Sequence, residues 1–254
     1  MPLRTNTLTL GADRALYVGE LPATGWHCHA SPVLLMGLSG RFALHWGAGL
    51  AHTCRSALVD AGVEHLFDPC GETVALVYLE PDSPEARGLR GVFQREGGVL
   101  PDVAAPVRSR AAVDGRLHAF DLRALLQAHL LEVAPTPLDP RVARSLHALR
   151  RPEHLRAPQQ GRLARADLAA EVQLSASRFN HLFRAEMGVS LRSYRVWSQV
   201  RLAMSGLAVS PRLTDAALHG DFADSAHFSR TFRQTFGMTP SSVLRPLKQV
   251  TLLG

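Results

Sequence analysis

A short pattern that occurs twice near the C-terminus constrains the fold of this 254-residue chain more than any other feature. Residues 177–190 match residues 226–239 at a constant offset of 49. The matched pairs are Phe179 and Phe228, Phe183 and Phe232, Arg184 and Arg233, and Gly188 and Gly237. The two phenylalanines of each copy are four residues apart, so both rings share one face of a helix. The glycine that follows stands where a left-handed C-terminal cap would end that helix.

Each predicted helix has an apolar back that carries the phenylalanines and a polar front of Arg, Ser, His and Asn side chains. Such a repeated short helix is typical of DNA-recognition helices. Residues 155–254 carry 13 Lys and Arg against 6 Asp and Glu, whereas the rest of the chain is nearly neutral. The basic excess therefore lies beside the repeat and favours contact with a polyanion there. Lys248 is the sole lysine, a bias toward Arg that a GC-rich genome would also produce.

The first 80 residues or so are typical of short strands, because apolar runs alternate with Gly, Pro and Asp. We expect a small sandwich or barrel. The period then changes, and apolar residues at helical spacing over 117–131 predict a helix of four to five turns. The helical segment 111–133 could mediate dimerisation or pack only on its own barrel. A Pro-rich stretch ends it, Asp139 is a candidate N-cap for a helix over 140–149, and 151–161 is predicted to be a loop.

From 162 to about 246 the pattern is helical. A small-residue helix over 163–172 leads through a turn at 173–175 into the first repeat, with Ser175 as its candidate cap. A long helix over 191–207 could join two modules. Residues 213–218 repeat the small-residue helix, and Asp224 or Ser225 is expected to cap the second repeat.

Read together, the two copies resemble the AraC/XylS family of bacterial transcription regulators. The resemblance rests on Asp167–Ser190 (DLA…LS.SRF..LFRAE.G.S) and on Ala226–Ser241 (AHFSRTFRQTFGMTPS), and it covers about the last 95 residues. It implies seven helices, with a long central helix holding two recognition helices roughly 34 Å apart, so that both enter successive major grooves.

The resemblance also implies residue roles. The base-facing positions of the first recognition helix are Ser177, Asn180 and His181, and those of the second are Ser225, Ala226, Ser229 and Arg230. Asn180 could contact adenine, and Arg230 could contact guanine. The candidates for phosphate contact are Arg178, Arg184, Arg192 and Arg233. Arg184 and Arg233 could instead pair with Glu186 or another carboxylate, and the phenylalanines are expected in the core.

The chain departs from the family at one turn. Members usually have Gly immediately before the Phe that opens the second turn, and here Asp221 stands there, before Phe222. Asp tolerates a left-handed backbone better than most residues but less well than Gly. We therefore expect a slightly strained turn.

In the N-terminal half, His27 and His29 followed later by Gly62-x-x-His65 resemble the cupin barrel. On one strand His27 and His29 would share a face, with Cys28 pointing away, and His65 could join them. Three imidazoles suit Zn, Ni, Cu or Fe. The metal-cupin pattern expects a Glu beyond the second His, where this chain has Pro32 and Val33, so an iron dioxygenase is not expected. The histidines could equally line an effector pocket or pack in the barrel.

The sequence thus predicts an α+β chain with an N-terminal cupin-like β-barrel with flanking helices and a C-terminal all-α double helix-turn-helix domain. The expected domains are 1–135 for effector binding and dimerisation, 136–160 as a linker with a short helix, and 161–254 for DNA binding. We expect a cytoplasmic, non-enzymatic transcription regulator, with no catalytic residues and no membrane contact. It would be controlled by a small molecule or a divalent transition metal at His27, His29 and His65.

The expected partners are double-stranded promoter DNA and a second copy of the chain, with RNA polymerase as a further candidate. Two alternatives stay open at this point. One is a metal-dependent cupin enzyme with a DNA-binding appendage, and the other is a constitutive DNA-binding dimer without an effector.

Overall fold

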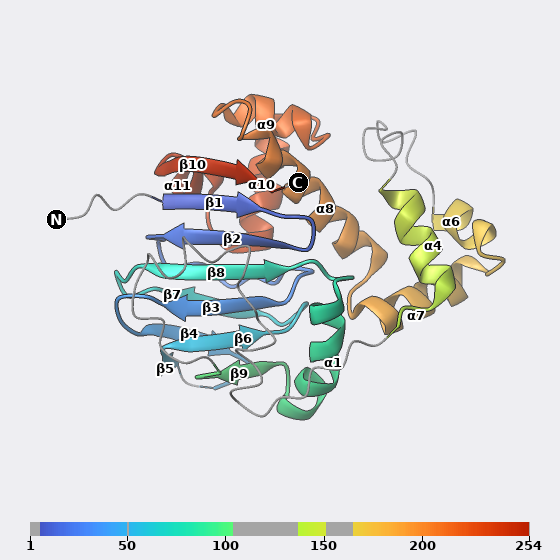
Figure 1. Ribbon diagram of the computed structural model, residues 1–254, viewed down its shortest axis with the longest axis horizontal. Coiled ribbons are helices and arrows are strands. Elements are labelled where there is room, and N and C mark those ends of the chain that lie inside the picture. Colours follow the sequence, from blue (N-terminus) through green and yellow to red (C-terminus); the bar gives the residue numbers. More distant parts are fainter. Residues whose placement is uncertain (1–5, 50, 104–136, 151–164, 254) are drawn as a thin grey trace. The chain divides into compact units, whose positions relative to one another are not determined.

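The computed structural model describes residues 6–49, 51–103, 137–150 and 165–253 (Figure 1). Spatial proximity divides the chain into two compact units. The β unit comprises Met1–Pro135 together with Ser229–Gly254, and the helical unit comprises Thr136–Phe228. The helix predicted over 117–131 and the loop predicted over 151–161 lie outside the described residues. The predicted domain boundaries at 135 and 160 also lie there and stay a prediction.

Two sheets form most of the β unit (Figure 1). The seven strands of the larger sheet, in spatial order, are β10 Leu247–Leu252, β1 Asn6–Leu10, β2 Arg14–Gly19, β8 Val74–Leu79, β3 Val33–Gly37, β6 Ser56–Val59 and β9 Val99–Pro101. The smaller sheet has the order β5 His52–Cys54, β4 Phe42–Trp46 and β7 His65–Asp68. All neighbours are antiparallel except β1 and β10. The strand-rich N-terminal half that the sequence predicts is thus confirmed.

The central strands of the larger sheet are buried on both faces. In β8 every second residue, such as Val77 and Leu79, joins an apolar core with helix α1 Pro84–Glu96. Tyr78 points to the opposite face, because successive strand residues alternate, and it too contacts other side chains there. The second face therefore packs against other parts of the β unit.

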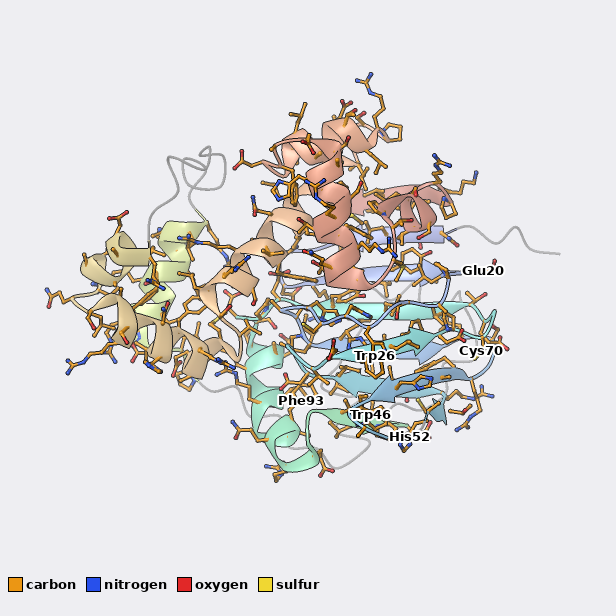
Figure 2. The ribbon with its side chains drawn as sticks, turned by 180° about the vertical axis from the view of Figure 1, so that it is seen from behind. Glu20, Trp26, Trp46, His52, Cys70 and Phe93 are labelled. Carbon is orange, nitrogen blue, oxygen red and sulfur yellow. The ribbon has the colours of Figure 1, made fainter. Side chains whose placement is uncertain are left out.

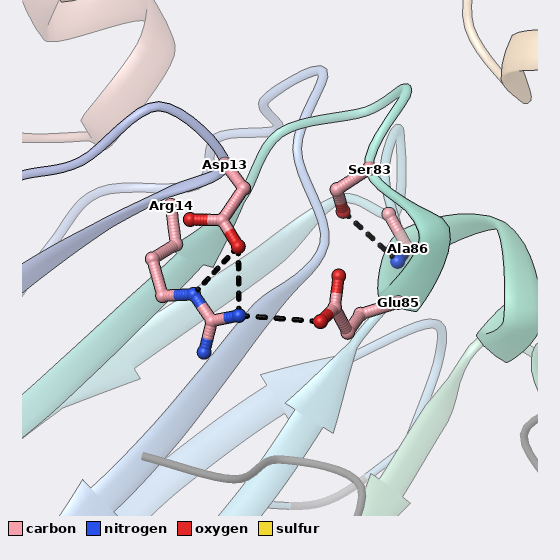
Figure 3. Close-up of polar contacts among 5 residues, drawn as sticks. All are labelled: Asp13, Arg14, Ser83, Glu85 and Ala86. Atoms are coloured by element: carbon pink, nitrogen blue, oxygen red, sulfur yellow. Dashed lines mark hydrogen bonds and ion pairs between the residues drawn. The ribbon is translucent and has the colours of Figure 1, made fainter. Parts of the chain in front are cut away.

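The N-terminal end of α1 is fixed by two sets of polar contacts (Figure 3). The Ser83 hydroxyl caps the helix by accepting the N–H of Ala86 at 3.1 Å. The guanidinium of Arg14, on β2, lies 2.8 Å from the Asp13 carboxylate and 3.2 Å from that of Glu85, in the first turn of α1. These contacts tie the start of α1 to the start of β2, an interior strand of the larger sheet.

Aromatic side chains also pack at the surface of the smaller sheet. The rings of Trp46 and His52, on neighbouring strands, have centroids 4.3 Å apart, and Figure 2 labels both.

Cys70 is exposed and has a left-handed backbone, with φ 55° (Figure 2).

The last strand, β10, was not predicted. It runs parallel to β1, with Leu8 opposite Val250, and extends the larger sheet by one strand. Residues at the two ends of the chain thereby become neighbours. The helical pattern predicted to end near 246 does end there, since α11 Pro240–Leu244 is the last helix of the described chain.

The remaining helices are α4 Pro140–Leu149, α6 Arg165–Glu171, α7 Ala176–Met187, α8 Leu191–Gly206, α9 Leu213–His219 and α10 Ser225–Phe236. The helix α10 crosses the division between the two units after Phe228. As predicted, the Asp139 side chain caps α4, accepting the N–H of Arg141 at 2.8 Å. An α+β chain with helix-turn-helix elements in its C-terminal part is thus confirmed. Over the described residues, no helix is both long and apolar enough to cross a membrane.

Candidate DNA-binding helices and a histidine cluster

The first helix-turn-helix consists of α6 and α7. Its second helix begins at the predicted cap, where the Ser175 hydroxyl accepts the N–H of Arg178 at 3.3 Å. It ends at Gly188, whose φ of 73° lets its N–H reach the Arg184 carbonyl at 2.9 Å. Both terminal signals read from the sequence are confirmed.

The second helix-turn-helix consists of α9 and α10 and is built in the same way. The Asp224 carboxylate accepts the N–H of His227 at 2.6 Å and caps α10, so Asp224 is the cap of the two candidates. At the other end Gly237 has φ 69°, and its N–H donates to the Arg233 carbonyl at 2.9 Å. The expected left-handed backbone at Asp221 is also present, with φ 56°.

The repeated phenylalanines form the back of both recognition helices. Phe179, Phe183 and Phe228 are completely buried, and Phe232 is 2% exposed. They pack against other rings, for example Phe183 against Tyr194 of α8 at a centroid distance of 5.7 Å. The prediction that these rings are core residues and not base-stacking residues is confirmed.

The opposite faces carry the predicted DNA contacts. The exposed members of this set are Ser177, Arg178, His181, Arg184, Ala226, Arg230 and Arg233, and the half-buried ones are Asn180, Ser225 and Ser229. Their positions are compatible with base and phosphate contact. Which of them contacts which group stays a prediction.

The alternative role for Arg184 and Arg233, pairing with a carboxylate, can be compared with the structure. Within the described part of the chain, neither arginine forms an ion pair. The Glu186 carboxylate instead accepts the backbone N–H of Asp139 at 2.9 Å, which ties α7 to the start of α4. Both guanidinium groups are exposed.

A second candidate site lies within the β unit. His27, His29 and His65 are 6%, 4% and 1% exposed, and one ring nitrogen from each lies within 4.8 Å of the others. Backbone hydrogen bonds between His27 and His65, at 2.9 and 3.1 Å, bring the 24–29 segment alongside β7. Cys28 is exposed and the two histidines are buried, as predicted, although residues 27–29 form an isolated bridge at His27 and not the predicted strand. The described residues hold no other group of His, Cys, Asp and Glu with this geometry.

Each of the three imidazoles is oriented by its own backbone. The Nδ1 atoms of His27, His29 and His65 lie 2.9, 2.6 and 2.9 Å from the carbonyl oxygens of Gly25, Ser31 and Val63. A carbonyl can only accept, so these contacts place the proton on Nδ1 and leave Nε2 with its lone pair. Metal-binding histidines are commonly oriented by such a bond.

Burial favours the neutral form of all three rings. Desolvation lowers the pKa of His27, and it lowers the pKa of His65 to about 4. The pKa of His29 is held well below its usual range, first by desolvation and then by the neighbouring His65 and His27. Neutral imidazoles are the ligand form that a divalent metal requires. The cluster therefore fits a three-histidine metal site, with no carboxylate in it.

Aromatic rings close the cluster on one side, and the sequence did not reveal them. The ring centroid of His29 lies 5.2 Å from that of Tyr78 and 6.5 Å from that of Phe236, and the last two are 5.7 Å apart. Burial raises the pKa of Tyr78. Tyr78 comes from β8 and Phe236 from the end of α10, so only the folded β unit brings them to the histidines.

Two helix-turn-helix motifs, one on each side of α8 in the chain, define a double helix-turn-helix DNA-binding domain. The family model described as a helix-turn-helix domain matches residues 168–246. The chain is 37% identical over 79 residues to the arabinose operon regulatory protein of Salmonella typhimurium, covering 30% of this chain and 27% of that protein. The segment 168–246 is therefore a helix-turn-helix domain of the AraC type.

Longer matches are more distant. The chain is 23% identical over 241 residues to the probable transcriptional regulator LumQ of Photobacterium leiognathi, covering 85% of this chain and 90% of that one. The crystal structure of unsaturated fatty acid bound ToxT from Vibrio cholerae has a TM-score of 0.56 at 14% identity, over 93% of this chain and 96% of that one. This likeness shows that the order of a β-rich part followed by helix-turn-helix elements is shared. The chain spans about a quarter of the length of the arabinose regulator that it matches.

Proposed function

We propose that this protein is a sequence-specific DNA-binding transcription regulator whose promoter occupancy is set by a ligand in the β unit. The observation that carries the proposal is the pair of capped helices with buried phenylalanine backs and exposed polar faces, in α7 and α10. The match of residues 168–246 to the helix-turn-helix family supports it. The proposed partner is promoter DNA, and the proposed oligomeric state is a homodimer. RNA polymerase is proposed as a further partner.

The test starts from the full-length protein and a random double-stranded DNA library. Repeated selection should enrich one sequence that contains two short recognition elements about one helical turn apart. Fluorescence anisotropy then compares the selected duplex with a scrambled duplex of the same composition. We expect at least a 10³-fold preference for the selected duplex at physiological salt. Equal affinity for the two duplexes would refute sequence-specific binding.

A specific observation favours a metal as the ligand. The three histidines present a preorganised, neutral ligand set inside the β unit. Such a set suits zinc, nickel, copper or iron. Elemental analysis of tag-free protein, compared with the His27→Ala/His29→Ala variant, tests it. A near-stoichiometric transition metal that the variant lacks supports a metal effector, and a metal-free protein directs the search to organic effectors.

A further inference from the structure

The turn that ends the second recognition helix lies directly against the histidine cluster. At Gly237 the backbone is left-handed, with φ 69°. A Cβ atom at this position would lie 2.9 Å from Nδ1 of His27 and would collide with the carbonyl oxygen of Gly25. The turn therefore approaches the imidazole as closely as a residue without a side chain allows. Both segments belong to the β unit.

Gly25 connects the two sides of this contact. Its carbonyl oxygen accepts from Nδ1 of His27 at 2.9 Å, and its N–H donates to the carbonyl of Gly237 at 2.8 Å. One residue thus orients a candidate metal ligand and holds the end of α10. A restraint on the His27 ring therefore acts on a residue that is also hydrogen-bonded to Gly237.

Phe236 makes a second connection. Its ring packs on Tyr78 and faces His29, with centroids at 5.7 and 6.5 Å. It also packs on Phe232, one turn earlier in α10, at 4.6 Å. Phe236 is therefore the side chain through which the apolar back of α10 reaches the cluster.

Beyond this turn the chain remains attached to the β unit. After α11, β10 pairs with β1 through five residues between Leu247 and Leu252, with Lys248 left out of the register. The end of α10 is thereby held in two places, at the histidine cluster and at the edge of the larger sheet. Of these two attachments, the one at the histidine cluster is the one that a bound ligand could strengthen or weaken.

We infer that occupation of the three-histidine site by a divalent transition metal is coupled to docking of the Phe236–Gly237 turn, so that the second recognition helix responds to metal. The inference rests on the proposed metal site and on the proposed DNA-binding role. Ligation restrains His27, and through Gly25 it favours the docked turn. By thermodynamic linkage, the factor by which metal strengthens docking equals the factor by which docking strengthens metal binding. A change that abolishes docking must therefore weaken metal binding, and DNA that shifts the docking equilibrium must shift metal affinity.

The first experiment measures zinc affinity of the full-length protein by competition with a chromophoric chelator. Phe236→Leu removes the ring that faces His29 without touching a candidate ligand, and Phe222→Leu is the matched control. Phe222 belongs to the second helix-turn-helix and packs on Phe228, at 5.2 Å. We expect Phe236→Leu to weaken zinc binding at least threefold and Phe222→Leu to leave it unchanged. Equal zinc affinity in all three proteins, each shown to be folded by circular dichroism, would overturn the coupling.

The second experiment follows the turn itself by hydrogen–deuterium exchange. Zinc should slow exchange at least threefold in peptides covering 24–29 and 233–240 of the wild type. It should have no effect in His65→Gln, which removes a ligand but leaves the bond between Gly25 and Gly237. Zinc should also change the Kd for the selected duplex at least threefold, and a change of either sign supports the coupling.

The outcomes separate the proposals. If zinc binds but neither exchange nor DNA affinity changes, the coupling is wrong and the metal site stands. If neither zinc nor nickel binds, the coupling and the metal site both fall, while sequence-specific DNA binding is judged by its own selection experiment.

Discussion

Gln173 and Asp221 hold the same left-handed backbone in the turns of the two helix-turn-helix motifs, with φ of 57° and 56°. The residue after each one donates its N–H to a carbonyl five residues back, at 2.8 Å in the first motif and 2.9 Å in the second. This bond closes the C-terminal end of a helix when the residue before it is left-handed. The motifs are therefore equivalent in backbone geometry, although neither turn has the glycine that this geometry favours.

Replacing either residue by Gly should stabilise the protein. A left-handed backbone costs a side-chain-bearing residue about 1–2 kcal/mol, and the greater freedom of Gly in the unfolded chain offsets about 0.4–1 kcal/mol of the gain. Asp tolerates this backbone better than Gln, so we expect Gln173→Gly to raise the free energy of unfolding more than Asp221→Gly. Urea denaturation of both variants measures the difference.

The control is Gln234→Gly, because Gln234 is exposed inside α10, where the backbone is helical. Glycine there should destabilise by about 0.5–1 kcal/mol. A loss of stability in Asp221→Gly would show that the turn is not strained.

Gly220 should not tolerate a methyl group. Its φ of −84° suits any residue, but a Cβ atom would lie 2.6 Å from Cβ of Ala203 and 2.8 Å from the carbonyl oxygen of Gln199, both in α8. Gly220→Ala should therefore destabilise the protein by about 1–3 kcal/mol, the usual cost of overpacking.

Gly91→Ala is the matched control, since Gly91 is exposed in α1 and its added methyl would meet only the end of Arg95. The control should gain about 0.5–1 kcal/mol. Thermal unfolding measures the midpoint temperature of each variant. Similar shifts in the two midpoints would contradict the close approach of α9 to α8.

Stability should depend on pH through Asp60. Desolvation raises its pKa from 3.8 to about 6, against the opposing effects of a hydrogen bond from Ala61 and the charge of Arg90. The folded state thus holds this proton more tightly than the unfolded state. The stability contributed by Asp60 is fully present below about pH 4 and is lost as the pH rises through 6.

Asp60→Asn keeps an oxygen that can accept the Ala61 N–H, which Oδ1 does at 2.8 Å, and removes the buried charge. Because Asp60 is only partly buried, we expect the variant to be more stable by about 1–2 kcal/mol at pH 7.5. The two proteins should converge at pH 4. Urea titrations at several pH values measure this, and a difference that stays constant from pH 4 to 7.5 would contradict it.

Much of the helical part could be predicted because its signals are local. Ser175, Asp224, Gly188 and Gly237 each act within a few residues of their own position, and the phenylalanine spacing alone shows which face is buried. His27 and His29 were also predicted to lie on one side of the chain, and both are buried beside His65, although they belong to an extended segment with an isolated bridge and not to a strand.

What could not be predicted depends on contacts between distant residues. The pairing of β10 with β1 joins the two ends of the chain, and nothing in either segment specifies the partner. Phe236 carries the pattern of an ordinary core residue, so its place beside Tyr78 and His29 follows only from the packing of the β unit. The close approach at Gly220 was hidden in the same way, because it depends on the helix opposite.

The two classes of DNA contact should separate in their salt dependence. Arg230 and Arg184 are both exposed on recognition helices, Arg230 in α10 and Arg184 in the last turn of α7. If Arg230 contacts a guanine, Arg230→Ala should cost about 1–3 kcal/mol on the selected duplex and relax the preference at one base pair. If Arg184 contacts a phosphate, Arg184→Ala should weaken binding to all duplexes alike and reduce the slope of log K against log salt by about 1. Anisotropy titrations at four salt concentrations, on the selected duplex and its single-base variants, measure both effects. If Arg184→Ala instead relaxed the preference at one base pair and Arg230→Ala weakened binding to all duplexes alike, Arg184 would contact a base and Arg230 a phosphate. Both recognition helices would then present a different face to the groove.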